Sequence, residues 1–126
     1  MIFSRVASLA LIAGLTMACE QCVHPGNFTG SVAWYTNTSN ICLGELPTIA
    51  AATPHHFWDP RDEAPCGMAI TVTNPNTGKS IVAIVAGQDE TLAGDNLLLT
   101  TAGLAGLAPD ANPNHVPAAV EWTFNG

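Results

Sequence analysis

Basic side chains are scarce in this sequence. Only three of its 126 residues are lysine or arginine, against ten aspartates and glutamates, and the formal net charge is −7. A surface of this charge repels phosphate backbones and anionic lipid headgroups. We therefore expect neither nucleic acid nor a membrane as a partner.

The sequence signatures of several enzyme and metal-binding classes are also missing. There is no Gly-x-Ser-x-Gly nucleophile elbow and no Gly-x-x-x-x-Gly-Lys phosphate loop. The four cysteines, Cys19, Cys22, Cys42 and Cys66, are spaced too irregularly for a zinc ribbon. We expect no metal and no cofactor.

A largely apolar run from Val6 to Leu15 is too short for a membrane-spanning helix, which takes about 20 residues. The run follows Arg5 and precedes the small-residue ending Thr16-Met17-Ala18, which is the layout of a secretory signal peptide. An acylated lipoprotein is the weaker alternative, because Leu15 lies one position too far from Cys19 for a good lipobox. The pattern predicts a secreted, extracellular protein.

These boundaries predict a signal peptide over 1–18, an N-terminal tail over 19–27 and one domain over 28–126. We expect the mature protein to be a monomer. An oxidising exterior favours disulfides, but four cysteines allow three connectivities, which the spacing does not resolve. Asn27 and Asn37 each begin a sequon for N-glycosylation.

Short apolar runs separated by proline, glycine and asparagine predict an all-β barrel or sandwich. The expected strands are Gly30–Tyr35, Thr48–Ala52, the hairpin Met68–Thr73 with Lys79–Ala86, and the closing Ala118–Phe124. The run Ile81-Val82-Ala83-Ile84-Val85 is nearly continuous in apolar residues, which predicts a central strand covered on both faces. Either Val82 or Val85 should face the core.

One short helix is expected between the strands Lys79–Ala86 and Ala118–Phe124. Thr100 or Thr101 is a plausible N-cap, Leu104 and Leu107 lie three residues apart, and Pro109 ends the pattern.

Three groups of residues could carry chemistry. His55-His56 lies in a loop with several carboxylates and could form a metal or acid–base site, although such loops are usually solvated. Trp34 and Tyr35 end a strand, where one ring could stack on a sugar; because neighbours in a strand point to opposite faces, we expect only one, Tyr35, to line a groove.

Acidic residues form the third group. Asp89, Glu90 and Asp95 follow the central strand and could supply the paired carboxylates of a glycosidase, although carboxylates in such a loop are more often plain surface charge.

The order of several short segments resembles the small secreted fungal proteins with an RlpA-like double-psi β-barrel, relatives of barwin, expansin domain 1 and the family 45 endoglucanases. The segments are Gly30–Tyr35, Cys42-Leu43-Gly44, Pro65-Cys66-Gly67, Gly78-Lys79-Ser80, Leu99–Leu104 and Val120-Glu121-Trp122. The resemblance implies an all-β, six-stranded double-psi β-barrel with one or two short helices and an open groove, often used on cell-wall polysaccharide.

The departures from that family concern catalysis and disulfides. The family's acids correspond here to Ala86 and Leu98, and alanine cannot protonate a leaving oxygen. Its two loop cysteines correspond to Gln88 and Thr91, so the resemblance implies that the remaining loop pair, Cys42 and Cys66, forms a disulfide.

Our leading hypothesis is a non-catalytic extracellular barrel that binds a cell-wall glycan or an extracellular protein in its groove. Trp34, Tyr35, His55 and Asp89 are the candidate ligand-binding residues. One alternative is a wall-polysaccharide enzyme, an endoglucanase or lytic transglycosylase, using Asp89 or Asp95. The other is an effector or inhibitor that binds a protein.

Overall fold

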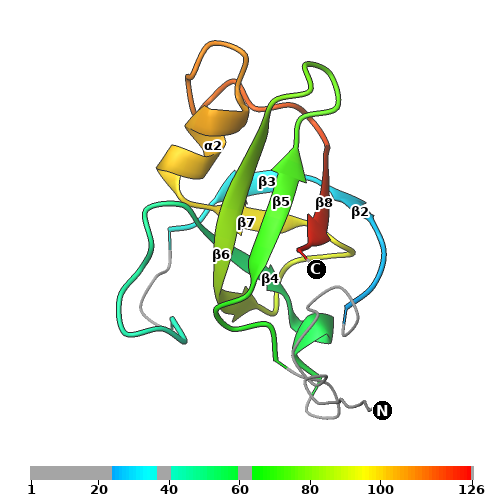
Figure 1. Ribbon diagram of the computed structural model, residues 1–126, viewed down its shortest axis with the longest axis vertical. Coiled ribbons are helices and arrows are strands. Elements are labelled where there is room, and N and C mark those ends of the chain that lie inside the picture. The colour runs from blue at the N-terminus through cyan, green and yellow to red at the C-terminus, as the bar shows by residue number, and fades with distance from the viewer. Residues whose placement is uncertain (1–23, 37–40, 60–63, 126) are drawn as a thin grey trace, which may run out of the picture.

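The computed structural model describes residues 24–36, 41–59 and 64–125 (Figure 1). The signal peptide, Cys19, Cys22 and the Asn37 sequon lie outside the described residues, so the predictions made for them stay predictions.

Seven short strands form one sheet whose order is β2-β8-β5-β6-β4-β7-β3. They are β2 (Phe28–Gly30), β3 (Val32–Trp34), β4 (Ala50–Pro54), β5 (Ala69–Thr73), β6 (Ser80–Asp89), β7 (Leu97–Leu99) and β8 (Val120–Phe124). The pairs β4–β6 and β3–β7 are parallel, and the other pairs are antiparallel. The long β5–β6 hairpin lies on one side, and β3 and β7 cross behind it (Figure 1).

The strand expected over residues 30 to 35 is two strands, which raises the count above the predicted six. The chain bends at Gly30 and Ser31 and so joins β2 and β3, the two outermost strands of the sheet order. A Cβ on Gly30 would lie 2.4 Å from the carbonyl oxygen of Asp95, so only glycine fits this close approach. The Ser31 N–H donates to Asn96 Oδ1 at 2.8 Å, which fixes the bend and leaves the barrel nearly closed.

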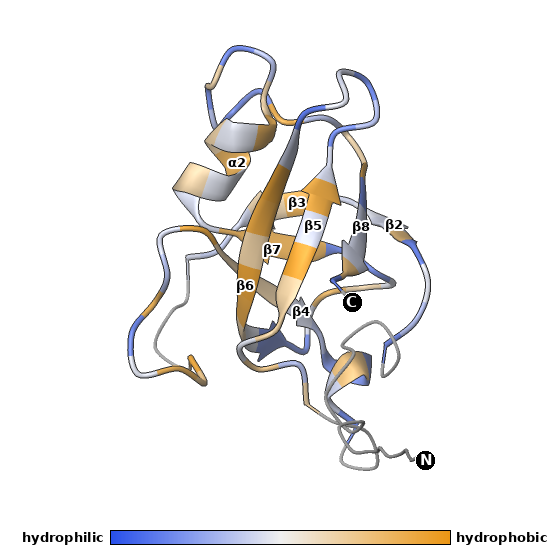
Figure 2. Ribbon diagram, viewed as in Figure 1, coloured by the Kyte–Doolittle hydropathy of each residue, from blue (hydrophilic) through white to orange (hydrophobic). Residues whose placement is uncertain are grey.

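The core is formed by the inward-facing side chains of the strands together with η2 and α2. Hydrophobic residues are concentrated on β5, β6 and β7, while the loops beyond them are hydrophilic (Figure 2). Its largest fully buried side chains are Ile70, Val72, Val85, Leu97, Leu99, Leu107, Trp122 and Phe124. The prediction that β6 is covered on both faces is wrong at Val82, whose side chain is 54% exposed, whereas Val85 is fully buried.

The described residues contain two short helices, within the one or two that the resemblance implied. The 3₁₀ helix η2 (His55–Trp58) follows β4, and α2 (Thr101–Leu107) packs against β6. Glycine lets α2 approach the sheet, because a Cβ on Gly106 would lie only 2.7 Å from Ile81 Cγ2. No helix in the described ranges is long and apolar enough to cross a bilayer.

The predicted disulfide between Cys42 and Cys66 is confirmed, with their Cα atoms 6.1 Å apart. The Cys42 N–H also donates to the carbonyl oxygen of Ala86 at 2.7 Å. The disulfide joins the loop before β4 to the loop before β5, and the backbone bond joins it to β6.

Candidate functional site

Trp34 is the most exposed large apolar side chain in the described part of the protein. It ends β3, where it pairs with Leu99 of β7, and 61% of its surface is exposed. A large aromatic ring left in solvent at a strand end is a common anchor for a ligand. The sheet therefore holds the indole on a rigid base at the mouth of a groove.

Two hollows meet at Trp34. The larger, of about 400 Å³, is lined by Trp34, Tyr35, Leu46, Pro47, Thr48, Thr100, Thr101 and Ala102. The smaller, of about 200 Å³, is lined by Trp34, Thr101, Leu104, Pro113 and Asn114. Because Trp34 and Thr101 line both, the hollows form one continuous surface, which we call the Trp34 groove.

Thr100 joins two segments that line the Trp34 groove by hydrogen bonds. Its hydroxyl donates to the carbonyl oxygen of Thr48 at 2.8 Å and accepts the Ala50 N–H at 3.1 Å. These bonds join the start of α2 to the segment before β4. The helix, the loop and the strands that line the groove are thus held in one arrangement.

Tyr35, unlike its neighbour Trp34, is buried. Its side chain is 6% exposed and packs with Ala50, Ala52 and Ala86, although it still lines the larger hollow. Burial raises the pKa of the phenol above its usual 10.0, and the negative charge of Asp89 raises it further. Tyr35 lines the larger hollow as expected, but the expectation that only one of the two rings does so is wrong, because Trp34 lines it too and is the more exposed.

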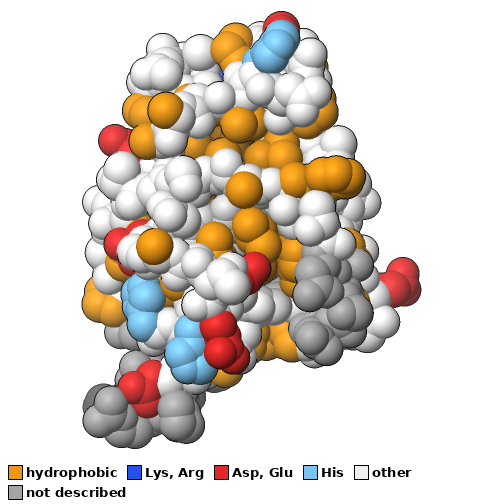
Figure 3. All heavy atoms as spheres, turned by 180° about the vertical axis from the view of Figure 1, so that it is seen from behind, with side chains coloured by type: hydrophobic (Ala, Val, Ile, Leu, Met, Phe, Trp, Pro, Cys, Tyr) orange, Lys and Arg blue, Asp and Glu red, His pale blue; other side chains and the backbone are white. Residues whose placement is uncertain are grey.

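The histidines predicted as a site lie at one end of the barrel. His55 Nδ1 is 2.5 Å from Gln88 Oε1 of β6, and His56 Nε2 is 3.2 Å from Asp95 Oδ1. From behind, histidine and acidic side chains gather at the lower end of this face, and another such group lies at its upper end (Figure 3). Within the described ranges, no three such side chains are placed to hold a metal ion.

The candidate acids Asp89 and Asp95 both form hydrogen bonds with nearby residues. Asp89 Oδ1 accepts bonds from the N–H and the hydroxyl of Thr91, at 2.8 and 2.5 Å. Asp95 contacts His56, and its carbonyl oxygen accepts the Trp122 indole N–H at 2.8 Å. Neither carboxylate lines the Trp34 groove. The structure therefore brings Trp34 and Tyr35 together but leaves His55 and Asp89 at another place.

Ala86 is fully buried, and Leu98 is partly buried beside the Tyr35 cluster. Neither side chain offers a group for proton transfer. That they replace acids of the family stays a prediction.

Sequence reasoning missed the loop residues of the groove. Thr48, Thr100 and Asn114 come from three segments far apart in the chain, and no local pattern connects them. The one local signal is Thr100, whose position in the sequence predicts a helix cap. Its hydroxyl instead bridges to the segment before β4.

No protein-family model and no curated protein matches the sequence. Comparison of structures does find similar folds. A Streptomyces papain inhibitor is 21% identical with a TM-score of 0.64, and the alignment covers 81% of this chain and 96% of the inhibitor. Apo expansin from Clavibacter michiganensis is 16% identical with a TM-score of 0.61.

A mutant of the same expansin, solved in complex with cellohexaose, is also 16% identical, with a TM-score of 0.60. Both expansin alignments cover 80% of this chain but 51% of the expansin, so the chain spans about half of that protein's length. At these identities the likeness shows the fold. The chain has the double-psi β-barrel fold that the resemblance implied.

Proposed function

We propose that this double-psi β-barrel is a secreted, non-catalytic protein that binds a cell-wall glycan along the Trp34 groove. The observation that carries the proposal is the exposed indole of Trp34 between two adjoining hollows. A pyranose ring can stack its C–H face on the indole, and each hollow then has room for a neighbouring sugar.

The polar groups of the groove suit a neutral polyhydroxyl chain. Thr48, Thr101 and Asn114 offer hydroxyl and amide groups that both donate and accept. Among the residues that the structure describes, no charged side chain lines either hollow. An anionic polymer would find no cation there, whereas a glucan or chitin chain needs none.

Secretion is supported by the signal-like N-terminus and by the disulfide between Cys42 and Cys66. Disulfides persist outside the cell and are rare in the cytosol.

A non-catalytic role is supported by the position of the acids. Cleavage of a glycosidic bond generally needs two carboxyl groups on opposite sides of that bond. Neither Asp89 nor Asp95 lines the Trp34 groove: Asp89 is bonded to Thr91, and Asp95 contacts His56. The enzyme alternative would require a substrate to reach these carboxylates instead.

Binding of a protein is the second candidate, and one finding favours it. The papain inhibitor aligns over almost its whole length with this chain, whereas expansin aligns over about half. An inhibitor would use exposed apolar side chains, of which Trp34 and Val82 are the largest in the described ranges. Inhibition of papain-like proteases is therefore the second assay to run.

The decisive test compares wild type with Trp34→Ala and Val82→Ala on insoluble glucan and chitin. Both substitutions remove an exposed apolar side chain, but only Trp34 lines the groove. We expect Trp34→Ala to weaken retention roughly 10-fold to 100-fold, the effect of losing a binding anchor, while Val82→Ala behaves as wild type.

Reducing-sugar release is measured in the same samples. Release by wild type that Asp89→Asn abolishes would establish the enzyme alternative. Absence of both retention and release, together with protease inhibition, would move the function to a protein partner.

A further inference from the structure

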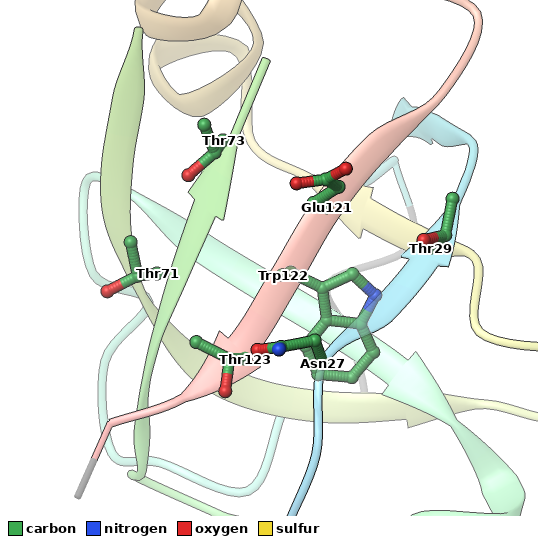
Figure 4. A pocket seen from close by; sticks show the side chains of 7 residues that line it. All are labelled: Asn27, Thr29, Thr71, Thr73, Glu121, Trp122 and Thr123. Carbon is green, nitrogen blue, oxygen red and sulfur yellow. The ribbon is translucent and has the colours of Figure 1, made fainter. Parts of the chain in front are cut away.

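A second hollow, of about 340 Å³, lies on the outer surface of β2, β8 and β5, and the Trp34 groove does not include it. Trp122 lines it but is only 2% exposed and packs in the core. The remaining side chains point outward from the three strands (Figure 4). We call them the threonine face: Asn27, Thr29, Thr71, Thr73, Glu121 and Thr123.

The strand register arranges the threonine face in two rows. Thr29 and Thr73 both pair with Glu121, which makes one row across the three strands. Thr71 pairs with Thr123 in the other row, and Asn27 directly precedes the pair of Phe28 with Trp122, so it lies at the end of this row. Neighbours are about 4.8 Å apart across strands and about 7 Å apart along them.

Two residues of the threonine face, Asn27 and Thr29, belong to a sequon for N-glycosylation. In Asn27-Phe28-Thr29 the first and third residues share the outer surface, because side chains two apart in a strand point the same way. Both residues are exposed, while Phe28 between them packs against the core. Asn-x-Thr is the acceptor sequence for N-linked glycosylation in a eukaryotic secretory route.

We propose that Asn27 carries an N-linked glycan whose first N-acetylglucosamine units lie on the threonine face. The glycan comes from a lipid-diphosphate-linked oligosaccharide. The side-chain amide nitrogen of Asn27 bonds to C1 of the first sugar and loses one proton, while the bond from C1 to the lipid diphosphate breaks and the diphosphate leaves.

The chemistry of the face matches such a sugar. The Glu121 carboxylate accepts hydrogen bonds from sugar hydroxyls, and the hydroxyls of Thr29 and Thr73 donate or accept. Thr71 donates to Asn125 Oδ1 at 2.6 Å, which leaves its oxygen as an acceptor toward the hollow. The threonine methyl groups offer apolar contact to the acetyl group and the sugar C–H bonds.

The covalent tether explains how so shallow a site is filled. A sugar fixed at Asn27 has a high effective concentration over the rest of the face, so individually weak bonds suffice. The glycan would also cover β2, which is an outermost strand in the sheet order and, within the described residues, pairs with β8 alone. Covering an exposed edge in this way prevents pairing between molecules.

The experiment expresses the full chain in a yeast secretory host and maps glycopeptides by mass spectrometry. We expect Asn27 to be occupied in wild type and the corresponding mass to vanish in Asn27→Gln. Glycan release by peptide-N-glycosidase is then timed on folded and on denatured protein. We expect release from folded wild type to be roughly 10-fold slower, because the seated sugars must first leave the face.

Two variants keep the sequon but remove contacts of the face, Thr73→Val and Glu121→Gln. We expect each to speed release from the folded protein several-fold, while Val82→Thr, an exposed change on β6 outside the face, leaves the rate unchanged. An unmodified Asn27 overturns the proposal, and so do equal rates for wild type and both face variants. Binding of free chitobiose by Asn27→Gln, with no glycan on wild type, would assign the hollow to an external sugar instead.

The proposal and the function of the Trp34 groove are independent. Asn27 and Trp34 line different hollows, so the glycan can be present whether or not the groove binds a polysaccharide.

Discussion

Trp34 and Tyr35 are neighbours in the chain, yet 61% of the Trp34 side chain is exposed and only 6% of the Tyr35 side chain. The two rings line the same hollow from different depths. Trp34 can meet a ligand, while Tyr35 packs against the alanines of β4 and β6 and supports the hollow from below. This division of roles is the basis of the first prediction.

Tyr35 should titrate above the usual tyrosine value of 10.0, because burial and the charge of Asp89 both disfavour the phenolate. It is the only tyrosine in the sequence, so ultraviolet absorbance of phenolate reports it alone. We expect Asp89→Asn to lower the Tyr35 pKa, and Glu90→Gln, the matched control one residue on, to leave it unchanged. An identical midpoint in wild type and Asp89→Asn would show that the two groups do not interact.

The same shift sets a pH dependence of stability. The pKa of Tyr35 is higher in the folded than in the unfolded chain, so the folded state holds its proton more tightly. This contribution to stability is complete below pH 10 and is lost as the pH rises through the folded pKa. Tyr35→Phe has no such proton. The free energy of unfolding, measured with denaturant, should therefore depend on pH in the same way for wild type and Tyr35→Phe near neutral pH, and it should fall more steeply for wild type above pH 10.

Val85 and Val82 provide a matched test of the strand β6. Val85 is fully buried and Val82 is 54% exposed, three residues apart on the same strand. Val85→Asp buries an unpaired carboxylate at a cost of several kcal/mol, which approaches the total stability of a small domain. We expect Val85→Asp not to be secreted in folded form and Val82→Asp to melt within a few degrees of wild type. Equal secretion and equal melting of the two variants would show that Val85 does not face the core while Val82 faces solvent.

The contrast between these two valines also shows what sequence can supply. The β5–β6 hairpin, α2 and the closing strand β8 all follow from local apolar spacing and turn residues, and the structure has them near the expected positions. The exposure of Val82 was not predictable from the apolar run alone. The run shows that both faces of β6 carry apolar side chains, but the position of α2 and the loops decides which of these side chains are covered.

The candidate site was less predictable, for a similar reason. The sequence singles out Trp34 and Tyr35 as a pair, but the strand β3 that carries Trp34 follows a bend at Gly30 and Ser31 that is fixed by Asn96, far along the chain. The threonine face, in contrast, has a local signal. Asn27-x-Thr29, Thr71-x-Thr73 and Glu121-x-Thr123 are each polar residues two apart in a strand, and only their pairing was unknown.

Gly106 should be sensitive to the smallest substitution. Its added Cβ would lie 2.7 Å from Ile81 Cγ2, so Gly106→Ala must push α2 away from β6. We expect a loss of about 1–3 kcal/mol, typical of overpacking, in denaturant unfolding. Gly44→Ala is the control, because nothing lies within 4 Å of its added Cβ. Ile81→Ala should partly restore the Gly106→Ala variant, and failure of this rescue would point to another cause.

The disulfide between Cys42 and Cys66 should stabilise the loop that forms one side of the Trp34 groove. The cysteines are 24 residues apart, and a loop of that length contributes about 3 kcal/mol through chain entropy. Cys42→Ala with Cys66→Ala should lower the free energy of unfolding by about that amount. Because Leu46 and Pro47 line the groove a few residues on, glycan retention should fall as well. Unchanged retention at a temperature where both proteins are folded would show that the loop does not need the bond.

The last prediction concerns the loop between α2 and β8, which carries Pro113 and Asn114 of the smaller hollow. His115 Nδ1 lies 2.7 Å from Asp110 Oδ2, and this bond, followed by the Asn112 N–H, lowers the pKa of Asp110 below its usual 3.8. Both side chains are more than half exposed, so the pair acts on the shape of the loop rather than on global stability.

Because the folded pKa of Asp110 is depressed, its contribution is complete above the usual value and is lost as the pH falls through the folded pKa. Carboxyl resonances followed by NMR should therefore show Asp110 titrating below 3.8 in wild type and closer to it in His115→Ala. The control is His56→Ala, which removes a different histidine–carboxylate contact, at Asp95, and should leave Asp110 unchanged. If His115→Ala moves the Asp110 titration no more than His56→Ala does, the two residues do not hold the loop together in solution, and the wall of the smaller hollow is set by the backbone turns of residues 110–114 alone.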